Sequence, residues 1–309
     1  MELGFLILTA LGLMLFEIIT SLDNAVINAD VLRTMSKRAR KWFLFWGIII
    51  AVFLIRGILP FVIIWAANPG LGPVEAFTAS FSSDPIVAES MELSKPILLV
   101  GGGVFLLFLF FHWLFIEPKH YGLIGEKKIH SDYGIWFYAV ISVLLAAIVW
   151  FAINKNPFMA FGAVVGSTAF FITHGFKENA AEHEKRMIGG EGMTDMSKIL
   201  YLEVIDATFS IDGVIGAFAF TLSVPLILIG NGIGALVVRE LTIHNIERVK
   251  KYKYLKNGAM YSVFFLGVIM IVDSFGVHVP QFISPVVTFI VIAYFFMKSK
   301  KELVAENKK

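Results

Sequence analysis

The chain has 309 residues, of which 57% are hydrophobic and only 16% are charged, and its mean hydropathy is +0.77. Soluble domains carry about 25% charged residues, so this composition excludes a domain that folds in water alone and predicts an integral membrane protein. The absence of cysteine excludes disulfides, thiolate metal sites and thiol nucleophiles. The net charge of +2 gives no reason to expect a nucleic-acid partner, and the expected partner is the lipid bilayer.

Nine apolar segments are long enough to cross the roughly 30 Å core of a bilayer as helices. They lie at residues 3–32, 42–67, 96–116, 133–153, 158–176, 198–220, 224–243, 258–276 and 279–297. Runs of this length favour an all-α polytopic bundle of about nine transmembrane helices over an outer-membrane barrel, whose strands are short and alternate. The first segment has no basic residues before it and no cleavage site after it, so we expect it to be retained.

Basic residues are distributed unevenly between the connections. All of the 26 lysines and arginines except Lys95, Lys155, Arg56 and Arg239 fall in alternate connections or in the tail. Because cytoplasmic loops carry the positive excess, we expect a plasma-membrane protein with its N-terminus outside and its C-terminus in the cytoplasm. That orientation requires an odd number of spans.

A short motif occurs twice, near the middle of the first and sixth spans. The first copy reads E-I-I-T-S-L-D-N from Glu17 to Asn24, and the second reads D-A-T-F-S-I-D-G from Asp206 to Gly213. The two spans run in opposite directions, so the copies form an inverted-topology repeat with an expected binding site between them near the midplane. We divide the single membrane domain into a first repeat (1–116), connecting spans (117–197), an inverted second repeat with the last span (198–297) and a tail (298–309).

Carboxylates at this depth are costly, at about 2.5–3.5 kcal/mol each, and therefore require a partner, a cavity or a cation. Arg56 is the main basic residue at that depth and Arg239 lies nearer the cytoplasmic end, so we expect bound cations or protons to balance the acids. Interhelical hydrogen bonding or pairing with arginine is the alternative. The predicted ligands for the metal are Glu17, Ser21, Asp23, Asn24, Glu203, Asp206, Ser210 and Asp212.

The helical faces give a further expectation. At 100° per residue, Glu17, Ser21 and Asn24 share one face, whereas Asp23 and Asp212 fall off the faces of their helices. We therefore expect the helices to unwind locally at both motifs, which turns the two aspartates inward and frees backbone carbonyls. An all-oxygen ligand set suits Mg²⁺, Ca²⁺ or Mn²⁺.

Other polar residues leave alternatives open. The connection before Lys95 carries Glu75, Asp84, Glu89 and Glu92 and is either a cation-attracting vestibule or an ordinary acidic loop. His174, Glu178 and Glu182 recur at helical spacing and are either a metal entry site or a solvated face. His112, Glu117 and Asp273 either relay protons or serve as caps and hydrogen-bonding groups. The glycine-rich stretches indicate close helix packing.

The paired motifs resemble the TerC family of integral membrane proteins, which is named for tellurium resistance and placed near the lysine exporter superfamily. The resemblance rests on Glu17, Ser21, Asp23 and Asn24 in the first half and on Glu203, Asp206, Phe209 and Asp212 in the second. It implies Mn²⁺ efflux with those acids as ligands, whereas Gly213 stands where many relatives have serine. Members have also been linked to metal supply for exported proteins and to membrane-protein biogenesis.

The leading expectation is a secondary exporter of divalent cations, with Mn²⁺ favoured over Ca²⁺ and other hard dications. It works by alternating access between the inverted halves, with H⁺ as the coupling ion and no enzymatic activity. No phosphate-binding Gly-x4-Gly-Lys-Ser/Thr loop is present to supply ATP drive from this chain. The alternative is a membrane-embedded metal-dependent enzyme, or an assembly or metal-supply factor. The oligomeric state stays open.

Overall fold

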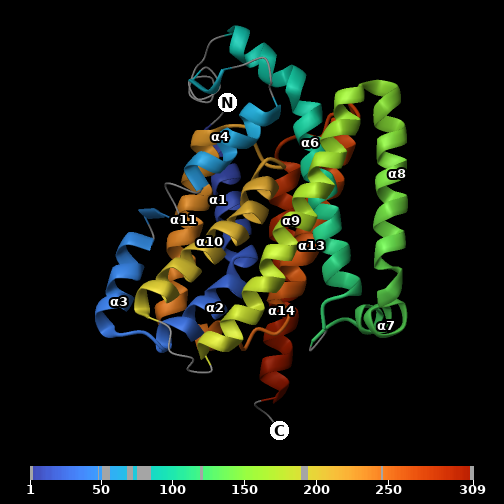
Figure 1. Ribbon diagram of the computed structural model, residues 1–309. Helices are drawn as coiled ribbons and strands as arrows, with labels where there is room; N and C mark the ends of the chain where they lie inside the picture. Colours follow the sequence, from blue (N-terminus) through green and yellow to red (C-terminus); the bar gives the residue numbers. More distant parts are fainter. Residues whose placement is uncertain are drawn as a thin grey trace.

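The computed structural model describes residues 3–47, 49–50, 56–67, 72–74, 85–118, 121–188, 194–244 and 246–306. These residues form a helical bundle with the two ends of the chain on opposite sides (Figure 1). We call the end where the first helix begins the N-terminal face, and the end where the last helix finishes the C-terminal face. Glu75, Asp84 and the residues from 189 to 193 lie outside the described part, as do the side chains of Glu89, Glu92 and Glu182.

The longer helices follow the predicted spans in order. The bounds of the described helices are Leu3–Thr20 (α1), Leu22–Arg33 (α2), Lys37–Trp42 (α3), Arg56–Ala67 (α4), Pro85–Phe115 (α6), Ile124–Tyr133 (α7), Phe137–Lys155 (α8), Pro157–Ile188 (α9), Asp195–Ala217 (α10), Val224–His244 (α11), Ile246–Val249 (α12), Leu255–Ser274 (α13) and Ile283–Glu306 (α14). Helices α3, α7 and α12 lie in connections between the predicted spans. A π-helical segment, Phe43–Gly47, continues α3. The all-α fold class is confirmed, and the described part of the chain contains no strand.

Seven of the described helices are long and apolar enough to cross a membrane, which supports a multi-pass membrane protein. They are α1, α6, α8, α9, α11, α13 and α14. Among the other predicted spans, α4 is shorter and α10 is interrupted by charged side chains. A helix that carries several acids is stable in a bilayer only where other helices cover those acids.

The first and second motif copies cross one another in opposite directions. Gly12 and Phe16 on α1 lie against Phe220 and Gly216, whereas Asn24 on α2 reaches back to Asp206. As the chain advances along α1 and α2, its partner positions move back along α10. The predicted antiparallel arrangement of the two motifs is therefore present in the structure.

Small residues bring the central helices together, as predicted. A Cβ atom added at Gly162 on α9 would lie 2.7 Å from the carbonyl oxygen of Ile97 on α6. A Cβ atom added at Gly234 on α11 would lie 2.8 Å from the carbonyl oxygen of Met14 on α1. Close backbone approach of this kind increases van der Waals contact between the helices. In a bilayer the lipid tails are as apolar as the helix surfaces, so this contact, and not the hydrophobic effect, drives helix association.

The expected unwinding of both motifs is wrong. Helix α10 runs without interruption through Ser210, Asp212 and Gly213. At the first motif only Ser21 leaves helical geometry, and the hydrogen bonds from Ser21 N to Glu17 O and from Ala25 N to Ser21 O continue across it. Because the backbone pattern is nearly unbroken, Asp23 and Asp212 keep their helical directions and do not turn toward the other acids.

Candidate functional site

Glu17 lies at the centre of the bundle and is 1% exposed. Its Oε1 atom accepts hydrogen bonds from Ser21 Oγ at 2.7 Å and from Arg56 Nη2 at 2.6 Å. Gly213 on α10 leaves the space for its Oε2 atom, because a Cβ atom there would lie 2.6 Å away. A glycine in the second motif thus makes room for the buried carboxylate of the first.

Asp206 lies on α10, where this helix crosses α2, and is 4% exposed. Its Oδ1 atom accepts hydrogen bonds from Asn24 Nδ2 at 2.5 Å and Asn28 Nδ2 at 2.8 Å. Its Oδ2 atom lies 3.9 Å from Nη1 of Arg239 on α11. The second copy of the repeat thus places its acid on the polar face of the first copy.

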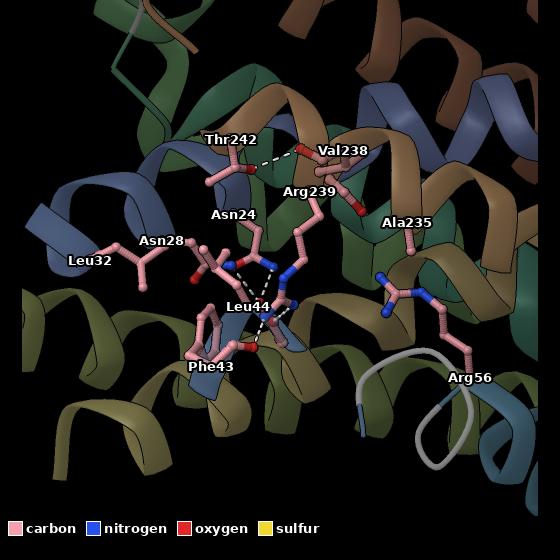
Figure 2. A pocket seen from close by; sticks show the side chains of 12 residues that line it. Asn24, Asn28, Leu32, Phe43, Leu44, Arg56, Ala235, Val238, Arg239 and Thr242 are labelled. Atoms are coloured by element: carbon pink, nitrogen blue, oxygen red, sulfur yellow. Dashed lines mark hydrogen bonds and ion pairs between the residues drawn. The ribbon is translucent and has the colours of Figure 1, made fainter. Parts of the chain in front are cut away.

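A cavity of about 40 Å³ opens between these helices. Its polar lining comprises Ser21, Asn24, Asn28, Arg56, Asp206, Arg239 and Thr242. In Figure 2, Asn24, Asn28 and Arg239 point toward one another, whereas Arg56 approaches from the opposite end. The volume accommodates a few waters or a partly dehydrated ion, since a single water needs about 10–15 Å³ on this measure.

Unpaired oxygen atoms surround this centre. Within the described residues, the buried side-chain atoms without a hydrogen-bond partner include Glu17 Oε2, Asn24 Oδ1, Asn28 Oδ1, both carboxylate oxygens of Glu203 and Asn231 Oδ1. One buried nitrogen near these atoms, Arg239 Nε, also has no hydrogen-bond partner. Glu203 and the Arg239 guanidinium both lie against Gly47 in the π-helical segment. Buried polar atoms without partners are costly, so this set of acceptors favours binding of ordered water or a cation.

The other two motif aspartates lie apart from the central cavity. Asp23 has a 47% exposed side chain and pairs with Lys256 of α13 at 2.9 Å. Asp212 has a 13% exposed side chain and pairs with Lys177 of α9. The structure therefore brings together five of the eight predicted ligands and separates three, including Ser210, whose hydroxyl donates to the backbone oxygen of Asp206.

The expectation that basic partners are too few is wrong in this structure. Arg56 pairs with Glu17, Arg239 lies beside Asp206, and lysines reach Asp23 and Asp212. Lys256 is the second residue of α13, whereas Lys177 lies within α9, and the long side chains of both extend toward the motifs. Glu203 is the motif-associated acid for which the described residues supply no ion pair within 4 Å.

Three residues of the centre were missed or left aside by the sequence reasoning. Asn28 shares a face with Glu17, Ser21 and Asn24, because these positions are spaced by whole helical turns. Asn231 is fully buried and donates to the Gly213 carbonyl at 3.4 Å. Arg239 reaches the cavity from α11, although its position in the span suggested a place nearer the face.

The remaining predicted polar residues lie outside this centre. His112 and His174 contact each other between α6 and α9. Glu117 accepts a hydrogen bond from Lys256 near the C-terminal face. Asp273 pairs with Lys95 at 3.4 Å where α13 ends. The proton-relay interpretation of these residues stays a prediction.

The helices and the buried polar centre define a polytopic helical membrane protein. A family profile described as "protein of unknown function (DUF475)" matches residues 22–308. The chain therefore belongs to this family. No curated protein and no solved structure matches the chain.

Proposed function

We propose that the protein is a secondary transporter that exports divalent metal cations, with Mn²⁺ as the substrate, across the plasma membrane. The proposal includes the relation to the TerC family suggested by the motifs. Its principal support is a set of unpaired buried oxygens. Those of Asn24 and Asn28 belong to the cavity lining beside Asp206, and those of Glu17 and Glu203 lie next to the lining residues Arg56 and Arg239. Carboxylate and amide oxygens are the donors that Mg²⁺, Ca²⁺ and Mn²⁺ prefer.

The arginines supply a means of releasing the metal. Arg56 and Arg239 occupy the same carboxylates that would ligate the dication. An incoming ion must displace them, and their return would lower the affinity of the carboxylates for the ion. The 3.9 Å separation between Arg239 and Asp206 is loose compared with the 2.6 Å contact at Glu17, so Asp206 and Glu203 form the more accessible part of the site.

Proton exchange would provide the energy. Moving a dication outward against about 100 mV, inside negative, costs about 4.6 kcal/mol before any concentration term. Carboxylates that bind either metal or protons link the two gradients. We propose that the inverted motifs rock against each other to expose the site to each face in turn.

The test is metal flux in proteoliposomes made with the full-length protein. Mn²⁺, Ca²⁺ and Mg²⁺ are compared with and without a pH gradient, using a fluorescent reporter of the entrapped metal. We expect gradient-dependent Mn²⁺ flux, which Asp206→Asn reduces at least about tenfold because it removes a charged ligand.

A matched substitution locates the site. Glu247→Gln changes an exposed acid that pairs with Arg33 at the C-terminal face and should leave the flux unchanged. Asp23→Asn and Asp212→Asn test whether the lysine-bound aspartates also serve as ligands during the cycle. Unchanged flux in Asp206→Asn would overturn the proposal. Metal binding without flux would favour the enzyme, assembly or metal-supply alternative.

A further inference from the structure

A second group of metal-binding side chains lies between α6 and α9, away from the residues that line the central cavity. Its members are His112, His174 and Glu178, whose ligand atoms all lie within 4.8 Å of one another. The imidazole rings of the two histidines have centroids 3.7 Å apart. His174 Nε2 lies 3.4 Å from Glu178 Oε1 and has no hydrogen-bond partner.

Aromatic neighbours fix the two rings. Phe170, one turn before His174, stacks on it with centroids 5.5 Å apart and an interplanar angle of 7°. Phe137 at the start of α8 meets His112 edge-on at 5.4 Å. The third member is adjustable, because the Glu178 side chain is 71% exposed. Two oriented imidazoles and a mobile carboxylate need only a small movement to reach bonding distances of about 2.0–2.2 Å.

We propose that His112, His174 and Glu178 form an accessory site for a transition-metal dication such as Zn²⁺ or Co²⁺. Two imidazole nitrogens and one carboxylate oxygen are a common ligand set for such ions and leave one position for water. This donor set differs from the all-oxygen centre, so it selects against Mg²⁺ and Ca²⁺.

The position of the site gives it a link to the repeat. Lys177 follows His174 on α9 and pairs with Asp212, the second motif aspartate. A dication held at the histidines would repel the Lys177 ammonium group and weaken its hold on Asp212. The accessory site shares no residue with the lining of the central cavity, so this proposal does not depend on transport through that cavity.

Co²⁺ binding to the full-length protein in detergent tests the proposal, with calorimetry for affinity and visible absorption for coordination. Glu178→Gln changes an exposed residue and leaves the core intact, and His174→Gln removes a nitrogen ligand. We expect each to weaken the affinity at the site at least about tenfold. The absorption bands of nitrogen-ligated Co²⁺ should disappear with His174→Gln.

Two controls separate this site from other metal binding. His278 is an exposed histidine in the connection between α13 and α14, and His278→Gln should bind Co²⁺ as the unaltered protein does. Glu17→Gln should retain the absorption bands even if it abolishes Mn²⁺ flux. Unchanged Co²⁺ affinity in both Glu178→Gln and His174→Gln would overturn the proposal, as would an equal loss in His278→Gln.

Discussion

Glu17 shows how much of the bundle depends on a single carboxylate. It is bonded to Arg56 of α4 and Ser21, and it packs against Gly213 of α10 and Gly234 of α11. A charge buried to this degree is tolerated only with its partner in place. Substitutions around Glu17 should therefore reveal both its structural role and its affinity for cations.

Removing the arginine leaves the buried charge uncompensated. We expect Arg56→Gln to lower the free energy of unfolding by about 3–5 kcal/mol in metal-free detergent solution. Added Mn²⁺ should recover more stability in this variant than in the unaltered protein, because the ion no longer competes with the guanidinium. Thermal unfolding with and without Mn²⁺ measures both effects.

Arg33→Gln is the matched control, because Arg33 pairs with Glu247 at the surface. Exposed pairs contribute about 0–1 kcal/mol, so its unfolding midpoint should hardly change. Equal destabilisation by the two substitutions would contradict the burial argument. Adding Glu17→Gln to Arg56→Gln should restore part of the lost stability, since it removes the unpaired charge.

The space at Gly213 can be tested with one methyl group. In Gly213→Ala the new Cβ atom would meet Glu17 Oε2, which Arg56 and Ser21 hold in place through Oε1. Overpacking costs about 1–3 kcal/mol, which outweighs the gain of about 1 kcal/mol from helix propensity. We expect a lower unfolding temperature. Gly4→Ala adds a Cβ atom that meets nothing within 4 Å and should not lower it.

Among the elements, α6 and α9 approach each other closely at Gly162, which lies against the backbone of Ile97. Gly162→Val would place Cβ 2.7 Å from the Ile97 carbonyl and force the two helices apart. We expect this substitution to destabilise the protein by more than about 1 kcal/mol. Gly175→Val lies on the same helix where a Cβ atom has open space, so it provides the comparison. Equal unfolding midpoints for the two variants would show that the close approach of Gly162 to Ile97 does not limit the side chain at this position.

The elements also show what the sequence can and cannot predict. Apolar length located the helices, and the repeated motif predicted the antiparallel crossing of α1 and α2 with α10, because both depend on local patterns. The partners of Asp23 and Asp212 are long lysine side chains from α13 and α9. Such contacts depend on how distant helices pack, which spacing along one helix does not specify. The expected unwinding failed for the same reason, since it assumed that both aspartates must face the cavity.

For the whole molecule, the charge distribution predicts which face lies in the cytoplasm. The chain contains no cysteine, so a single introduced thiol reports its own exposure. We expect Val277→Cys, in the exposed connection between α13 and α14, to react with an impermeant maleimide in intact cells. Lys301→Cys, near the end of α14, should react only after permeabilisation. The reverse pattern would invert the proposed orientation and the proposed direction of export.

The order of synthesis follows from the pairing of the buried charges. Glu17 leaves the ribosome 39 residues before Arg56, which corresponds to about 2–8 s at typical rates of translation. During that interval the acid has only Ser21 and must stay protonated, solvated or shielded by the insertion machinery. Asp206 leaves the ribosome 182 residues after Asn24 and 178 residues after Asn28. The acid of the first motif is therefore made before its charge partner, whereas the acid of the second motif is made after the two asparagines that bond to it.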